Sequence, residues 1–162
     1  MDTRAALKSQ YHAALKTLRL AMEMCPEDRW NDPADGVPTF WRVSYHTLFY
    51  THFYLQDDHE HFTPWEHHRS DAFEGDDGGP PNPDVSYTRE QLLDYWHQCN
   101  AMVDERVDAM DLDAADCGFP WYPLPKLEHQ LVNLRHIQHH AAALSSRLRR
   151  EAGVAVPWVG RA

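Results

Sequence analysis

The sequence lacks a long hydrophobic run, and this absence bears on where the protein works. No apolar stretch approaches the roughly 18 residues that a membrane-spanning helix needs. The opening residues Met1-Asp2-Thr3-Arg4 also lack the apolar segment of a secretory signal peptide. We therefore expect a cytoplasmic protein with no membrane partner.

Cysteine and basic residues are both scarce. The three cysteines are odd in number and far apart, at Cys25, Cys99 and Cys117, which argues against a disulfide framework and against a CxxC metal knuckle. Only 15 lysines and arginines stand against 25 aspartates and glutamates, so the formal net charge is −10. Such a charge repels phosphate backbones, and we expect no nucleic acid partner.

Histidine, by contrast, is abundant, with 12 copies in 162 residues. At neutral pH most histidines are uncharged, and each then offers a ring nitrogen that can bind a metal ion. A chain of this length buries roughly 70% of the surface that its unfolded form exposes, which is enough for one substantial core. The sequence therefore predicts a single domain over residues 1–162, and the placement of its histidines decides what that domain can do.

Four segments repeat apolar residues every three or four positions, as amphipathic helices do. They cover residues 7–25, 39–56, 88–110 and 125–151. Pro26 follows the first segment, Thr39 is the expected N-cap of the second, and Gly153 follows the last. The third opens on Thr-Arg-Glu-Gln at residues 88–91, which matches a capping box. The second is rich in aromatic residues, so a strand is its competing interpretation, but it lacks strict alternation.

Two irregular stretches separate these segments, at residues 57–87 and 111–125. A connection as long as the first is uncommon inside a compact domain, and such connections often cover a site or serve a partner. Each helix must bury an apolar stripe, and the helices do so most simply against one another. The sequence therefore predicts an all-α fold, an antiparallel four-helix bundle with long connecting loops.

The last helical segment carries two histidines on one face. A step of about 100° per residue places His136 and His140 within about 40° of each other, with His129 in the same arc two turns earlier. His-x-x-x-His is a spacing with which metalloproteins direct two imidazoles at one ion. His139 points away from this face, and we expect it to be solvated. The alternative is a polar helix edge on the flank of an apolar core stripe at Leu127, Leu131, Leu134, Ala141 and Leu148.

The second segment supplies a candidate third ligand, His46. Its direction falls in an arc shared with Val43, Tyr50, Phe53 and Tyr54, so we expect it to be at least half-buried. A buried polar ring without a partner costs about 1–3 kcal/mol, so His46 requires either a metal or a hydrogen bond. The alternative to a ligand is a core histidine bonded to a tyrosine or to a backbone carbonyl.

The long connection contains a rival histidine cluster, formed by His59, His61, His67 and His68. Nothing in the neighbouring sequence predicts a rigid frame for these side chains. Metal affinity depends on ligands that their surroundings hold in place, so we interpret this cluster as a solvated loop.

Two stretches of the chain resemble the DinB-like superfamily of metal-binding four-helix bundles. Residues 41–50, Trp-Arg-Val-Ser-Tyr-His-Thr-Leu-Phe-Tyr, resemble its second helix with a lone histidine ligand. Residues 133–144, Asn-Leu-Arg-His-Ile-Gln-His-His-Ala-Ala-Ala-Leu, resemble its last helix with the His-x-x-x-His pair. The resemblance implies that His46, His136 and His140 bind one divalent ion, most often zinc or nickel, with positions open for water or substrate. The chain departs from many relatives at residues 141–143, where alanines replace a polar residue.

The resemblance also implies a function. Characterised relatives include transferases and isomerases that use a low-molecular-weight thiol such as bacillithiol or mycothiol, and members of the family are usually homodimers. We therefore expect a metal-dependent thiol S-transferase or isomerase that acts on a small molecule. A metal-bound thiol loses its proton and becomes a nucleophile at neutral pH. His129 or Tyr50 could assist as a proton donor or orienting group, or could simply pack.

Three other functions stay open at this point. The same site could activate water for hydrolysis, because zinc lowers the pKa of bound water to about 7. The metal could instead only stabilise a non-catalytic bundle, in which case a fourth protein ligand is expected. The chain could also be an interaction protein that presents its long loop to a partner.

Overall fold

The computed structural model describes residues 2–33, 38–72 and 82–162. These residues form four long helices, α1 (Thr3–Met24), α3 (Phe40–Tyr54), α4 (Arg89–Ala109) and α5 (Lys126–Ala152). A short helix, α2 (Glu27–Trp30), and a 3-10 turn, η1 (Ser70–Ala72), lie in the connections. No strand occurs in the described ranges, so the all-α prediction is confirmed and the strand alternative for residues 39–56 is wrong.

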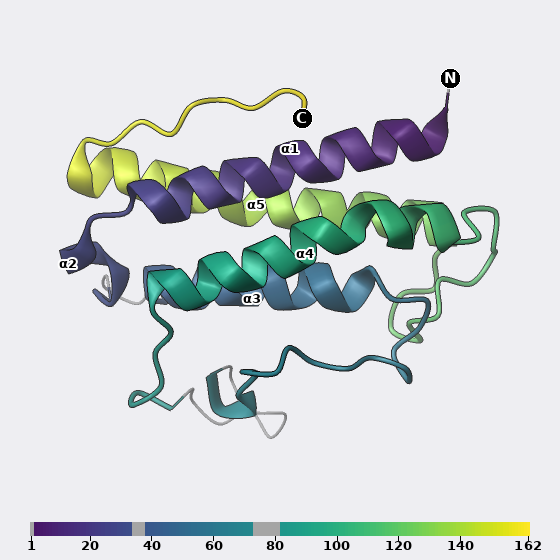
Figure 1. The fold of residues 1–162 in the computed structure, drawn as a ribbon, viewed down its shortest axis with the longest axis horizontal. Helices are drawn as coiled ribbons and strands as arrows, with labels where there is room; N and C mark the ends of the chain where they lie inside the picture. Colours follow the sequence, from purple (N-terminus) through teal and green to yellow (C-terminus); the bar gives the residue numbers. More distant parts are fainter. Residues whose placement is uncertain (1, 34–37, 73–81) are drawn as a thin grey trace.

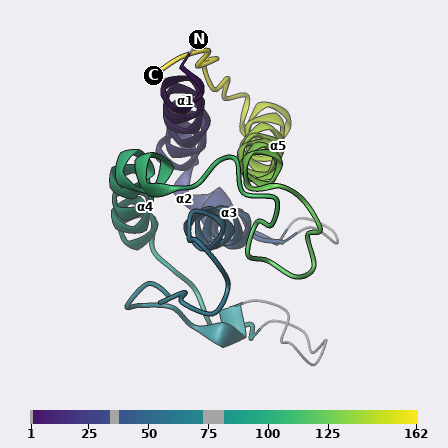
Figure 2. The ribbon, with the colours of Figure 1, turned by 90° about the vertical axis from the view of Figure 1, so that its right-hand side faces the viewer.

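The four long helices pack side by side in a bundle (Figure 1 and Figure 2). α1 lies against α4 and α5, and α3 lies against the same two helices from the other side. The antiparallel arrangement holds for α1 with α4 and for α3 with α5, whereas α1 runs parallel to α5 and α3 runs parallel to α4 (Figure 1). α4 starts at the same end as α3 because the connection between them carries the chain back along the bundle.

Local signals mark the helix ends as expected. In the capping box of α4, Thr88 Oγ1 accepts from the backbone N–H of Gln91 at 3.2 Å, and Gln91 Oε1 accepts from the N–H of Thr88 at 2.9 Å. Gly153 ends α5 with φ of 67°, a left-handed conformation that glycine adopts without a steric penalty. Thr39 does hold the N-cap position of α3, but its side chain makes no capping bond.

The face that α5 buries differs from the expected one. Leu131 is 48% exposed, and the buried residues of the helix include Gln130, Asn133 and Ile137. The polar pair is tolerated because other helices supply partners for the whole Gln130 amide and for Nδ2 of Asn133, which donates to the carbonyl of Thr51 at 3.3 Å. The Gln130 side chain accepts from Tyr11 Oη at 2.7 Å and donates to the carbonyl of residue 54 at 3.0 Å. The prediction of a core stripe through Leu131 is therefore wrong.

The described part of the long connection is packed rather than loose. Trp65 and Tyr87 are buried, and the Trp65 ring stacks on Tyr95 of α4 with centroids 4.5 Å apart and planes 3° apart. Tyr87 Oη also donates to the backbone carbonyl of His67 at 2.7 Å. The expectation that this region lacks a rigid frame is therefore wrong for residues 65–68 and 85–87.

Beyond α5, the C-terminal segment runs back along α1 (Figure 1). Val154 and Val156 pack against the core, and Gln10 Nε2 donates to the carbonyl of Gly160 at 3.4 Å. None of the helices in the described ranges combines the length and the apolar character that crossing a membrane requires.

Candidate metal centre

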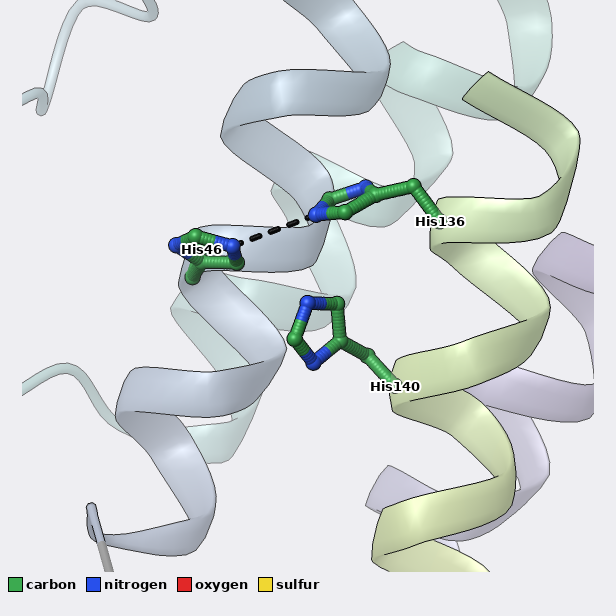
Figure 3. Close-up of side chains that lie close together, drawn as sticks. All are labelled: His46, His136 and His140. Atoms are coloured by element: carbon green, nitrogen blue, oxygen red, sulfur yellow. Dashed lines mark hydrogen bonds between the residues drawn. The ribbon is translucent and has the colours of Figure 1, made fainter. Parts of the chain in front are cut away.

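The candidate centre lies between the antiparallel helices α3 and α5. His46 projects from the middle of α3, and His136 and His140 project from successive turns of α5 toward it (Figure 3). The prediction that His136 and His140 share one face of α5 is confirmed, and that face is turned toward His46. Because the three side chains come from two packed helices, the frame that holds them is the bundle itself.

The three rings converge at distances that suit one ion. Nε2 of His136 lies 3.1 Å from Nε2 of His46, and one ligand nitrogen from each histidine lies within 4.8 Å of the other two. The ring of His140 is centred 4.8 Å from that of His46 and 4.6 Å from that of His136. In a tetrahedral site with metal–nitrogen bonds of about 2.0–2.1 Å, neighbouring ligand nitrogens lie about 3.3 Å apart. Small side-chain rotations therefore suffice to bring all three within bonding distance of one ion.

Burial keeps the three imidazoles neutral. Desolvation, followed by the proximity of His140 and His46, lowers the pKa of His136 to about 3. Desolvation and the neighbouring His46 lower the pKa of His140 to about 4, and desolvation also lowers the pKa of His46. At pH 7 each ring therefore has one unprotonated nitrogen, and a metal ion can bind it without displacing a proton.

One nitrogen of the cluster has no partner among the described residues. Nδ1 of His136 is buried and makes no hydrogen bond there, while its Nε2 faces His46. A metal-binding histidine usually donates its other N–H to a carboxylate or carbonyl, which orients the ring. Three neutral imidazoles fit a metal ion, and no described group accepts from Nδ1 of His136 to orient its ring.

Tyr50 lies beside the cluster, as expected. Its ring is centred 4.8 Å from that of His46 and 5.8 Å from that of His136, to which it stands nearly perpendicular. It occupies the next turn of α3 after His46, so its position follows directly from the helical repeat.

The structure places His129 in an aromatic cage two turns from His136. Its ring stacks on Phe119 at 4.7 Å and also contacts Tyr54 at 4.9 Å and Tyr122 at 5.3 Å. The ring is fully buried, Nε2 has no hydrogen-bond partner in the described structure, and burial lowers its pKa to about 4. These contacts separate His129 from the other three histidines and give it a packing role.

The rival histidines of the long connection diverge. His59 is bonded to the carbonyl of Gly118 at 3.1 Å, and His61 to Asp58 at 2.8 Å. Within the described ranges the only set of three or more histidine, cysteine or acidic side chains spaced to hold a metal is His46, His136 and His140. His139 is exposed, as predicted.

His68, like the half-buried His59, departs from the solvated loop. It is half-buried, its Nδ1 lies 2.6 Å from Tyr45 Oη, and its ring stacks on Phe49 with centroids 5.1 Å apart. The prediction of solvation is wrong for this residue. Its partners belong to α3, so no pattern within the loop could have revealed them.

A hollow of about 290 Å³ lies at the surface near the end of the bundle, apart from the three histidines. It is lined by Asp58, His59, Glu60, Asp116, Gly118 and Pro120. Its carboxylates are not spaced to hold a metal ion. The candidate metal site is therefore the three histidines and not this hollow.

Comparison with known proteins found one family. The model of the DinB superfamily matches residues 10–144, a span that contains all three converging histidines. No curated protein and no solved structure matches the chain.

Proposed function

The chain belongs to the DinB superfamily, and from that membership and the histidine geometry we propose that it is a metal-dependent enzyme. In this proposal His46, His136 and His140 hold one divalent ion, zinc or nickel, between α3 and α5. The observation that carries it is the convergence of three neutral imidazoles from two helices within 4.8 Å.

The number of ligands supports catalysis over a purely structural metal. Structural zinc sites have four protein ligands, whereas catalytic sites have three and keep one position open. In the described structure the group contains three residues. The open position would accept a small-molecule thiol or water, whose pKa a bound metal lowers enough to give a nucleophile at neutral pH.

We propose thiol S-transfer or isomerisation as the reaction, with a low-molecular-weight thiol as cosubstrate. The two helices hold the imidazoles so that their nitrogens face a common point, and their burial keeps protons off those nitrogens. Tyr50, one turn after His46 on α3, would form one wall of the site and orient the substrate. We also propose that the protein works as a homodimer in the cytoplasm and does not bind nucleic acid.

Elemental analysis of protein purified without a histidine tag tests the site. We expect one metal equivalent in the wild type and almost none in the His46→Ala and His140→Ala variants. His139→Ala is the matched control, because His139 is exposed and adjacent to His140, and we expect it to keep its metal. Equal metal content in wild type and His46→Ala would refute the assignment.

An activity assay then tests the reaction. Several low-molecular-weight thiols are paired with a panel of electrophiles, using wild type, His46→Ala and His139→Ala. We expect thiol conjugation or isomerisation that is lost in His46→Ala and retained in His139→Ala. Turnover without any thiol would favour the water-activating alternative.

A further inference from the structure

Aromatic rings continue along α3 from the histidine cluster. A step of about 100° per residue puts His46, Tyr50 and Phe53 within about 60° of one another on that helix. The Tyr50 ring is centred 4.8 Å from His46 and 6.4 Å from Phe53, so the three rings follow one another along the helix. With a rise of about 1.5 Å per residue, Phe53 lies about 10 Å beyond His46.

Trp121 extends this row to the surface. It belongs to the connection between α4 and α5, and its ring lies nearly parallel to that of Phe53, with centroids 6.0 Å apart. Trp121 is 50% exposed, although tryptophan is highly buried on average. The row therefore ends in an aromatic surface that solvent can reach.

The connection is built to hold Trp121 in that position. Phe119 is fully buried and packs edge-on against Trp121 with centroids 5.7 Å apart. The Tyr122 N–H donates to the carbonyl of Phe119 at 2.8 Å, which closes a turn around the tryptophan. Gly118 has φ of 83°, and a Cβ there would clash with the carbonyl oxygen of Asp57, so the close approach to the segment that follows α3 requires glycine. Exposure of Trp121 thus results from an ordered loop.

We propose that Trp121 and Phe53 bind an aromatic group of the substrate whose reacting atom lies at the three histidines. This inference rests on the proposed function, and it specifies the substrate as an elongated molecule with an uncharged aromatic ring. The ring is separated from the reacting atom by a chain that spans two helical turns. Stacking on Trp121 and Phe53 discriminates a flat aromatic ring from a saturated ring of similar size.

Two thiols of equal length test the proposal on the zinc-loaded full chain. Their binding is measured by isothermal titration calorimetry, with 7-phenylheptane-1-thiol as the aromatic probe and 7-cyclohexylheptane-1-thiol as the saturated one. We expect the wild type to bind the aromatic thiol about fivefold more tightly, which is the scale of one aromatic stacking contact. The short thiol phenylmethanethiol cannot reach from the histidines to Trp121, and its affinity should not depend on Trp121.

Substitutions at the surface then locate the preference. Trp121→Leu should remove the preference for the aromatic thiol while leaving zinc content at one equivalent, and Trp121→Phe should restore most of it. Trp158 is the matched control, because it is 78% exposed on the C-terminal segment, and Trp158→Leu should keep the wild-type preference. An equal preference in wild type and Trp121→Leu, with both proteins folded by circular dichroism, would overturn the proposal.

A ligand without a thiol separates this proposal from the proposed function. Metal-free protein is titrated with 7-phenylheptan-1-ol, whose binding does not require the ion. We expect Trp121→Leu to weaken this binding about fivefold, and Trp158→Leu to leave it unchanged. If the protein binds no metal but shows this pattern, the proposed metal-dependent function is refuted and the aromatic binding surface is supported. If the protein binds metal but lacks the pattern, the aromatic binding surface is refuted and the metal site is supported.

Discussion

His129 and His136 stand two turns apart on α5, yet their surroundings give them different roles. His129 is fully buried among Phe119, Tyr54 and Tyr122, and no second imidazole reaches it in the described structure. His136 is half-buried and faces His46 of α3 at 3.1 Å. Desolvation lowers the pKa of both rings, to about 4 for His129 and about 3 for His136.

The chemistry open to each histidine therefore depends on which side chains the neighbouring helix and loop place beside it. At the level of His129, α3 contributes Tyr54, and the α4–α5 connection contributes two more aromatic rings. At the level of His136, α3 contributes another imidazole. The first environment only packs a neutral ring, whereas the second assembles a donor set for a metal.

Breaking the cage should have the largest effect on stability. Phe119 is fully buried and stacks on His129, so Phe119→Ala leaves a cavity and should destabilise the protein by about 3–5 kcal/mol. Urea denaturation of wild type and variant measures the change. Metal content should stay at one equivalent at temperatures where the variant is folded, and loss of metal there would contradict the separation of the two environments.

Removing a ligand should have the next largest effect, and only when metal is present. Zinc at about 100 times its dissociation constant should stabilise the wild type by about 2.7 kcal/mol, because it binds the folded chain. His136→Ala should lose this increment, measured as the difference between urea denaturation with and without zinc. His139→Ala is the control and should keep it, since His139 is exposed on the same helix. The same zinc increment in His136→Ala would exclude it as a ligand.

Acid should destabilise the metal-free protein through its buried histidines. Burial lowers the pKa of His52 and of His129 to about 4, below the usual value near 6.5. The folded state therefore binds fewer protons, and the stability is complete above pH 6.5 and declines as the pH falls toward 4. At pH 5.5 the loss should be about 1 kcal/mol for each of these two residues, with the three converging histidines adding in the same direction. Urea denaturation at pH 7 and 5.5 measures this, and equal stability at both would contradict the burial of neutral rings.

Replacing the caged imidazole should have the smallest effect and the opposite sign. Nε2 of His129 is buried without a hydrogen-bond partner in the described structure, so His129→Phe removes a desolvation penalty while keeping an aromatic ring. We expect a gain of about 1 kcal/mol at pH 7 and a weaker dependence on acid. His136→Phe is the comparison, because it should abolish metal binding. A loss of metal in His129→Phe would show that the cage and the metal site are coupled.

Much of the fold could be predicted because the decisive signals are local. The capping box at Thr88 and the left-handed Gly153 depend on residues within a few positions of each other. The apolar stripe of α1 is likewise confirmed, with Leu7, Tyr11 and Leu18 buried. The pairing of His136 with His140 on one face follows from the helical repeat, and the buried direction of His46 on its own helix makes it a candidate third ligand, which the family resemblance supports.

The remaining features depended on contacts between distant parts of the chain. The predicted buried face of α5 differs from the observed one because Gln130 finds its partners on α1 and α3, and no pattern in α5 reveals them. The prediction of solvation fails for His68 because its partner, Tyr45, lies 23 positions away in the sequence. Trp121 lies in an irregular stretch whose spacing predicts nothing about which helix it will meet.

The sequence by itself determined where the four helices begin and end and which residues share a face, since backbone hydrogen bonds and side-chain direction in a helix depend on near neighbours. Only the tertiary structure decided which faces meet. It paired α1 with α5 and α3 with α4 in parallel, brought His46 to His136, and enclosed His129. The reason is physical: packing selects among rotations of each helix by the partners that the other helices supply.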